Sequence, residues 1–286
     1  MRVAAIVRPG ISVPEVKAFH QEPGIAWRDG LPPRAEDADA VMIFGGDGTV
    51  HRFLPELVQL RLPVLVVPHG SGNDFARALG LRNLGDSLGA WRNFAAGAGN
   101  VRVIDLGTIT DSAGVKRFFG TVAGVGLDGA VLRRANRLPR WLRGNGGYVL
   151  SLLLVLWRFR AANMNITLDG ETQAGQIVLA AFANAAAYGG GMKIAPKARL
   201  DDGRLDVCLI HELSRLKLAA VFPRVYSGGH LGVREFEYQQ VASVRVETDV
   251  PWDVNADGEY VCRTPVEIGV ESAAMRVIVP SGKSKP

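Results

Sequence analysis

The sequence predicts two domains, an α/β domain followed by a mainly β domain of sandwich-like architecture. Near the N-terminus, two apolar segments are each followed by a glycine-containing loop and then by apolar residues at helical spacing. From Thr108 onward, short segments of β type replace these helical patterns. A length of 286 residues is enough for two modest hydrophobic cores. The chain therefore fits one α/β domain and one β-rich domain.

The first glycine loop is the sequence Gly45-Gly46-Asp47-Gly48-Thr49, which follows an apolar run at 41–44 and precedes a helical pattern. Glycines let a backbone turn its N–H groups toward a bulky anion, and a helix N-terminus adds partial positive charge. These features predict a strand, a phosphate-binding loop and a helix. An ordinary turn between strand and helix fits the glycines alone equally well. Pro55 requires the helix to begin near Arg52, so that the proline falls in its first turn.

A second segment, at 62–81, repeats this design. An apolar strand at 64–67 leads into a loop at 68–73, and a short helix follows that Gly80 closes. Ligands of open α/β sheets bind at the carboxyl ends of the strands. Two neighbouring strands that end in such loops therefore bring the following polar side chains to a candidate ligand site: Asp47, Thr49, Ser71, Asn73 and Asp74.

The other elements of the first domain are less distinctive. Residues 3–7 form an expected buried strand, and 84–96 have the pattern of an amphipathic helix. A strand at 101–104 is expected to end at Asp105.

The second domain begins at 108 and contains six expected strands. They lie at 117–122, 165–168, 176–184, 205–210, 243–248 and 266–270. An insert at 133–160 interrupts them with arginines, Trp141, leucines and then an apolar helix. This insert fits an interfacial surface, where arginines meet lipid headgroups and apolar side chains enter the acyl boundary. A helical hairpin packed on the sheet fits it as well.

Composition limits the partners. A net charge of +5 and a pI near 9.4 favour an anionic partner. No zinc-finger or RNA-recognition signature accompanies the charge, so we expect contact with nucleotide phosphates and a membrane surface, and none with nucleic acid. The apolar run at 148–157 is too short to span a bilayer, and the N-terminus has no signal peptide pattern. Cys208 and Cys262 are expected to be reduced core thiols of a cytosolic protein.

Several motifs, in their order along the chain, resemble a known family. They are GGDGT at 45–49, GSGNDFARALG at 70–80, GVGLDGAV at 124–131, GGGMKIAPKARLDDGRLDV at 189–207 and DGE at 257–259. Together they are similar to the diacylglycerol kinase and sphingosine kinase superfamily, in particular its soluble bacterial lipid kinases, over about residues 41–280. The resemblance implies a Rossmann-like α/β domain at 1–107, to which a strand at about 275–286 returns, and a lipid-substrate domain at 108–274 that carries the insert.

The resemblance also implies ATP and Mg²⁺ as cofactors. ATP would lie in the cleft between the domains. Its expected site consists of Gly45, Gly46, Asp47, Gly48, Thr49, Val50, His51, Arg52, Gly70, Ser71, Gly72, Asn73 and Asp74.

Two groups of oxygen ligands for Mg²⁺ follow from the resemblance. Asp47, Asp74 and Asp105 resemble an aspartate network that holds the metal partly through water, since Mg²⁺ prefers carboxylates, phosphates and retained waters. The alternative for each aspartate is capping or turn formation. A structural site is implied in which Asp202 gives its carboxylate and Arg199 and Arg204 give main-chain carbonyls.

Glu259 is the expected general base, and Asp47 is the second expected catalytic residue. In-line phosphoryl transfer needs a carboxylate that takes the proton of the acceptor hydroxyl. The implied activity is ATP-dependent phosphorylation of diacylglycerol or a related lipid. The alternatives are a kinase for another alcohol, such as a sphingoid base, polyisoprenol or polyol, and a non-catalytic lipid- or nucleotide-binding regulator.

Some residues depart from the family pattern. Arg8-Pro9 stands where relatives usually have Asn-Pro, and His51-Arg52 stands where they commonly have Asn-Glu. Arg52 either contacts phosphate or is solvated. Trp27 either covers a nucleotide base or packs as a surface tryptophan. The resemblance further implies a cytoplasmic protein that is peripheral at the inner membrane face; homodimers are common among relatives, but the sequence has no interface signature.

Overall fold

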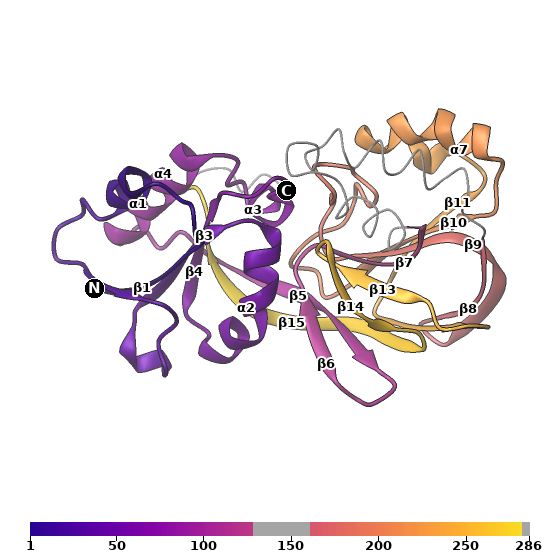
Figure 1. Cartoon of the computed structure of the whole chain (residues 1–286), viewed down its shortest axis with the longest axis horizontal. Coiled ribbons are helices and arrows are strands. Elements are labelled where there is room, and N and C mark those ends of the chain that lie inside the picture. Colours follow the sequence, from indigo (N-terminus) through magenta and orange to yellow (C-terminus); the bar gives the residue numbers. More distant parts are fainter. Residues whose placement is uncertain (128–160, 282–286) are drawn as a thin grey trace. The chain divides into compact units, whose positions relative to one another are not determined.

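The computed structural model describes residues 1–127 and 161–281. The chain divides into two compact units, unit 1 with residues 1–104 and 273–286 and unit 2 with residues 105–272 (Figure 1). The insert predicted at 133–160 lies outside the described residues, so neither interpretation of it is tested.

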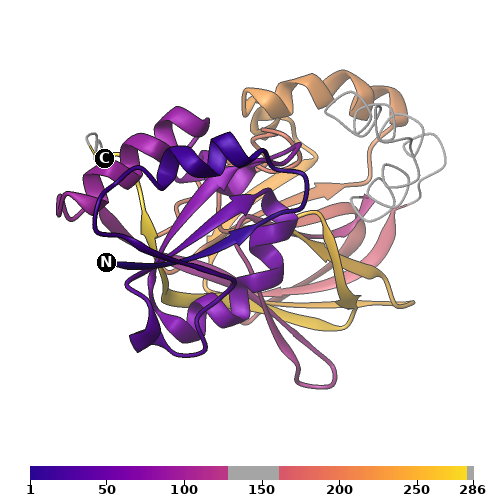
Figure 2. The same cartoon turned by 60° about the vertical axis from the view of Figure 1, so that its left-hand side comes forward.

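Unit 1 contains a parallel sheet in the order β15-β4-β3-β1-β2. Its strands are β1 (Arg2–Val7), β2 (Ala26–Asp29), β3 (Ala40–Gly45), β4 (Pro63–Pro68) and the end of β15 (Val266–Ile278). Its helices are α1 (Val13–Phe19), η1 (Ala35–Asp37), α2 (Asp47–Leu60), α3 (Asp74–Ala78) and α4 (Leu84–Ala95). Helices α1 and α4 lie side by side on one side of the strands, and α2 lies on the other (Figure 1, Figure 2). The predicted α/β architecture is confirmed.

Helix α2 begins at Asp47, so the expected start near Arg52 is wrong. Pro55 therefore lies inside the helix, where a proline removes one backbone hydrogen bond and costs about 3 kcal/mol. Burial of Val50, Leu54 and Leu57 offsets this loss because each side chain leaves water almost completely. Packing of the apolar face of α2 thus outweighs the preference of proline for the first turn of a helix.

Strand β5 (Val101–Asp111) continues past Asp105, where the sequence predicted its end. The buried Asp105 carboxylate accepts a hydrogen bond from Gly203 N at 2.7 Å, and Asp105 N donates to Leu200 O at 2.6 Å. An aspartate inside a strand is tolerated here because these partners compensate its loss of water.

Trp27 packs within unit 1. Its ring stacks on His20 at 4.0 Å between centroids, and the ring of Trp91 lies 5.8 Å away. Trp91 is fully buried and donates to Phe19 O at 3.2 Å. These contacts favour the packed interpretation of Trp27 over a base-covering role.

Unit 2 is mainly β. Its main sheet has the antiparallel order β14-β13-β7-β9-β8-β12-β15; β10 joins β9 and β11, and β5 pairs with β6. The strands are β6 (Lys116–Phe119), β7 (Val122–Gly126), β8 (Ala162–Leu168), β9 (Glu171–Ala183), β10 (Leu205–His211), β11 (Phe236–Val241), β12 (Ser243–Thr248), β13 (Asp253–Ala256) and β14 (Glu259–Arg263). The short helices are α7 (Arg215–Val221), η3 (Phe222–Tyr226) and η4 (Gly229–Gly232).

Unit 2 has two apolar clusters, and β9 contributes to both. Ala180 and Phe182 belong to one cluster, whereas Ala181 and Ala183 belong to the other, which also contains residues of α7. Side chains of a strand alternate between the two faces of its sheet, so one long strand can serve two cores. Cys208 and Cys262 are buried free thiols, and burial raises the pKa of Cys208 to about 12.

Candidate active site

The two glycine loops of unit 1 touch through their backbones. A Cβ on Gly46 would lie 2.7 Å from Gly70 Cα, and a Cβ on Gly70 would lie 2.6 Å from Gly46 Cα. His69 N also donates to Gly45 O at 2.9 Å. Glycine is required at both positions because any side chain would force the loops apart. The prediction that neighbouring strand ends bring these loops together is confirmed.

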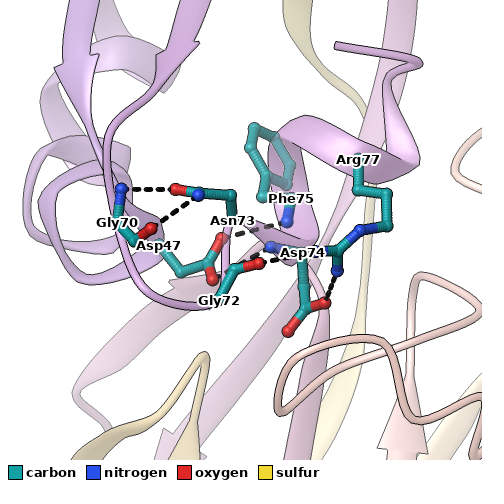
Figure 3. A network of polar contacts seen from close by, with 7 residues as sticks. All are labelled: Asp47, Gly70, Gly72, Asn73, Asp74, Phe75 and Arg77. Atoms are coloured by element: carbon teal, nitrogen blue, oxygen red, sulfur yellow. Dashed lines mark hydrogen bonds and ion pairs between the residues drawn. The ribbon is translucent and has the colours of Figure 1, made fainter. Parts of the chain in front are cut away.

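Asn73 closes the second loop on itself. Its side-chain oxygen accepts from Gly70 N at 2.6 Å, and its amide group donates to Gly70 O at 2.7 Å (Figure 3). Asn73 has a φ of 53°, a left-handed conformation that asparagine adopts more readily than most residues. The side chain therefore fixes the path of the loop.

Asp47 joins the two loops. It is the first residue of α2, and its carboxylate accepts hydrogen bonds from Asp74 N and Phe75 N, both at 3.0 Å (Figure 3). These two N–H groups begin α3, so a carboxylate of one helix caps another. A Cβ on Gly72 would lie 2.9 Å from the Asp47 carboxylate, which explains the glycine there.

Arg77 is a residue of this network that the sequence analysis missed. Its guanidinium forms an ion pair with Asp74, and its Nη2 donates to Gly72 O at 2.8 Å (Figure 3). Only 5% of Asp74 is exposed, and the buried carboxylate is stabilised by the adjacent positive charge. The signal for this pair was its spacing of three residues on a helix.

Cationic side chains lie near both loops. Arg8, which departs from the family pattern, donates to His69 O at 3.3 Å and so contacts the start of the second loop. The exposed Arg52 guanidinium lies 5.6 Å from the centre of the Phe53 ring. The N-terminus of the 14-residue α2, together with these glycine backbones, suits an anion. Asp47 at the same place suits a cation bound beside it.

In unit 2, Glu259 follows a tight turn, as predicted. Asp257 and Gly258 have φ values of 52° and 84°, and Ala256 pairs with Glu259 across the two-residue hairpin. Positive φ at both central positions matches the right-handed twist of a hairpin. Glu259 is therefore presented, exposed, at the first position of β14.

Asp257 anchors this turn, a role that the sequence did not reveal. Its carboxylate accepts from Gly120 N at 2.8 Å, Thr121 N at 2.7 Å and Thr121 Oγ1 at 2.6 Å. The fully buried Asn184 donates to Gly120 O and to Asp105 O, at 3.1 and 3.0 Å. Main-chain and side-chain bonds thus connect the turn before Glu259 with Asp105.

The expected structural metal loop lies next to Asp105. Gly203 N bonds to the Asp105 carboxylate, and the Asp202 carboxylate accepts from Arg204 N at 3.2 Å and from Gln240 Nε2 at 2.8 Å. The Arg199 side chain pairs with Asp201, at 3.4 Å, which leaves only its carbonyl relevant to a metal. No group of three His, Cys, Asp or Glu side chains forms a metal site among the described residues.

Asp206 adds negative charge beside this loop. It bonds to the Tyr238 hydroxyl, and Gln240 Nε2 lies 3.5 Å from it. Burial raises the pKa of Asp206, and the charge of Asp202 acts in the same direction. The Asp202 carboxylate and the main-chain carbonyls of Arg199 and Arg204 would offer hard oxygen atoms, the type of ligand that Mg²⁺ prefers.

The structure thus groups the predicted residues within each unit. In unit 1 the contacts bring together Gly45, Gly46, Asp47, Thr49, Gly70, Gly72, Asn73 and Asp74, and these contacts do not include Arg52 or Ser71. Asp105 is joined to the loop of Arg199, Asp202 and Arg204 in unit 2, and Glu259 lies on the hairpin that Asp257 anchors.

Unit 1 is a parallel α/β unit with paired glycine loops, and unit 2 is a β-rich unit with an exposed carboxylate on a tight turn, features that suit an enzyme of phosphoryl transfer. Residues 31–109 match the diacylglycerol kinase catalytic domain, and residues 121–279 match the YegS C-terminal NAD kinase beta sandwich-like domain. The chain belongs to the diacylglycerol kinase family.

Relatives span most of the chain. A protein of Mycobacterium tuberculosis named diacylglycerol kinase is 38% identical over 86% of this chain and 78% of its own length. A probable lipid kinase YegS-like of Chromohalobacter salexigens is 28% identical over 97% of this chain and 90% of its own.

Solved structures share the fold. A putative diacylglycerol kinase of Bacillus anthracis has a TM-score of 0.76 at 22% identity, covering 98% of this chain and 97% of its own. An NAD kinase of Archaeoglobus fulgidus, solved in complex with ATP, has a TM-score of 0.57 at 14% identity, covering 98% of this chain and 94% of its own. The predicted fold class is confirmed.

Proposed function

We propose that this protein transfers the γ-phosphate of ATP to a hydroxyl of diacylglycerol or a closely related lipid. The observation that carries the proposal is the bond between the two glycine loops through Asp47, which holds an anion-binding loop and a carboxylate at the same strand ends. The relative of M. tuberculosis that is named diacylglycerol kinase supports this acceptor.

In this proposal, the backbone of the first loop and the start of α2 bind the phosphates of ATP, with Ser71 and Asn73 on the second loop as neighbours. Arg52 is exposed and adds positive charge on the second turn of α2. The Asp74 carboxylate forms an ion pair with Arg77 and acts mainly by fixing the second loop.

The charge balance at the start of α2 calls for a cation such as Mg²⁺. When bound, it supplies positive charge that neutralises phosphate oxygens. Asp47 and the nucleotide are both negative, so their common place at the start of α2 requires a cation. Asp202, with the carbonyls of Arg199 and Arg204, would hold a separate structural ion, for which the hard oxygen donors of this loop argue.

Glu259 serves as the general base in the proposed reaction. The lipid hydroxyl oxygen forms a bond to the γ-phosphorus, the bond from that phosphorus to the ADP oxygen breaks, and the proton moves to Glu259. Exposure of Glu259 on its turn suits this role because a base must reach the substrate.

The lipid is presented at a membrane surface in this proposal, and the protein acts as a peripheral, cytoplasmic enzyme at the inner membrane face. Among the described residues, no helix is both long and apolar enough to cross a bilayer. The net charge of +5 favours an anionic surface. Nucleic acid is not expected as a partner, and a homodimer is compatible with the proposal.

The test is transfer of labelled γ-phosphate from ATP to a panel of lipids and soluble alcohols, with and without Mg²⁺. Glu259→Gln should lose at least about 100-fold in kcat, within the range for general base catalysis. Asp47→Asn should also lose kcat, because it removes the negative charge beside the proposed cation. Glu267→Gln, an exposed glutamate of β15, is the matched control and should retain activity. If only a sphingoid base or a polyol is labelled, that alcohol is the acceptor in place of diacylglycerol. If nothing is labelled although ATP binds, the protein is better explained as a non-catalytic regulator that binds lipid or nucleotide.

A further inference from the structure

The segment formed by α7 and η3 in unit 2 exposes large apolar side chains. Leu216 is 79% exposed, the largest value among the large hydrophobic residues that the structure describes, and Tyr226 is 38% exposed. A single exposed leucine is common on protein surfaces. Here the exposed groups lie on one short helical segment, and the Phe222 and Tyr226 rings pack edge to face at 5.9 Å.

The inner side of this segment is firmly anchored. Leu218, Val221 and Val225 are buried in the apolar cluster that also contains Val178 and Ala181 of β9. Leu216 therefore cannot turn inward without displacing this core. Its side of α7 also carries Ala219 and Ala220, which are exposed, so the outward stripe is small and apolar where a surface helix usually carries polar residues.

Positive charge flanks the outward stripe. From 213 to 234 the chain contains no Asp or Glu and four cationic residues, namely Arg215, Lys217, Arg224 and Arg234. All four are exposed. Lys217 forms an ion pair with Glu235, at 2.6 Å, which lies just beyond this stretch. The charge of the surface is therefore complementary to an anionic partner.

We propose that α7 and η3 dock on a lipid bilayer that contains anionic phospholipid. Leu216 enters the boundary between headgroups and acyl chains, Tyr226 lies at headgroup level, and Arg215 and Arg224 contact lipid phosphates. An apolar centre flanked by long basic side chains suits this interface, because arginine and lysine keep their charges in the headgroup layer while their stems are buried.

This proposal rests on the proposed function for its purpose, since an enzyme whose acceptor is a membrane lipid must reach the bilayer. Its physical basis is independent of catalysis. Binding to vesicles needs neither ATP nor Glu259, so the two proposals fail separately.

The experiment is sedimentation of the full chain with vesicles of phosphatidylcholine, with or without 30–40% phosphatidylglycerol, at about 0.1 M salt. Leu216→Glu should lower partitioning onto the anionic vesicles roughly 10-fold or more, because it replaces the apolar side chain that enters the bilayer by a charged one. Arg215→Glu with Arg224→Glu should lower it by a similar factor and abolish the preference for the anionic vesicles.

The control with the same change of charge is Arg28→Glu with Arg82→Glu, two exposed arginines of unit 1. It should reduce partitioning less than 3-fold. The circular dichroism spectrum and the urea midpoint of Leu216→Glu should match those of the wild type, which would establish that the variant is folded independently of any activity. Unchanged partitioning of a folded Leu216→Glu variant, equal loss in the control, or no binding of the wild type to anionic vesicles would each overturn the proposal; the last would favour a protein partner for this surface.

Discussion

Removal of the Asp257 carboxylate should loosen the turn that presents Glu259. That carboxylate accepts three hydrogen bonds from Gly120 and Thr121, and Thr121 is only 2% exposed. A hydrogen bond to a charged acceptor contributes about 1.5–3 kcal/mol, and a buried donor left without a partner costs about 1–3 kcal/mol. Because neighbouring bonds are not additive, we expect Asp257→Gly to lower the free energy of unfolding by about 3–5 kcal/mol.

Two further variants separate the backbone from the side chain. Asp257 has a φ of 52°, a conformation that glycine adopts without strain and alanine does not. The free energy of unfolding should therefore be about 1 kcal/mol lower in Asp257→Ala than in Asp257→Gly. Asp257→Asn keeps one acceptor oxygen and tolerates the positive φ, and it should lie between glycine and the wild type.

Hydrogen exchange of the amides at 120–121, together with urea unfolding, measures these effects. The N–H groups of Gly120 and Thr121 should lose protection in Asp257→Gly. The same variant should lose kcat through the displaced Glu259, with KM for ATP unchanged. An Asp257→Gly protein that unfolds at the wild-type urea concentration and keeps both amides protected would refute the anchoring role.

Three other expectations concern the loops of unit 1 and a buried histidine. Gly70→Ala should abolish ATP binding, measured by calorimetry, because its Cβ would meet Gly46 Cα at 2.6 Å, whereas Gly89→Ala in α4 meets no atom within 4 Å and should bind ATP normally. Asp47→Ala should lower stability by roughly 1–3 kcal/mol in urea unfolding as well as activity, since two N–H donors of α3 lose their acceptor; equal stability would contradict the capping role. Burial lowers the pKa of His230 in the folded protein, so as pH falls the unfolded chain is protonated at this histidine before the folded chain is. The free energy of unfolding should therefore decrease as pH drops below about 6.5, the pKa of an unperturbed histidine. His230→Gln should show a smaller change of its urea midpoint between about pH 7.5 and 5.5 than the wild type shows.

Much of unit 1 was predictable because its signals are local. The apolar runs of β3 and β4, the glycines that follow them and the helical spacing after Asp47 lie within a few residues of one another. The tight turn before Glu259 was predictable for the same reason, since an Asp-Gly pair favours it.

The errors and omissions depend on contacts distant in sequence. The preferences of proline predict a helix start near Pro55, but burial of the apolar face of α2 stabilises a helix that already begins at Asp47. An aspartate normally ends a strand, yet Asp105 is satisfied by Gly203, 98 residues later. Asp257 and Asn184 likewise act through Gly120, so a single sequence gives no sign of their roles.

The pairing of β15 with β4 has a consequence for synthesis on the ribosome. β4 ends at residue 68, but its neighbour on that side is contributed by residues 276 and 277. At roughly 5–20 residues per second, about 10–40 s pass between the emergence of the two strands. During that interval β4, an apolar strand, has an open edge of the kind that pairs with other chains. A nascent chain, or one truncated before residue 276, should therefore aggregate through β4 or depend on chaperones, and the α/β unit can close only after residues 276 and 277 have been synthesised.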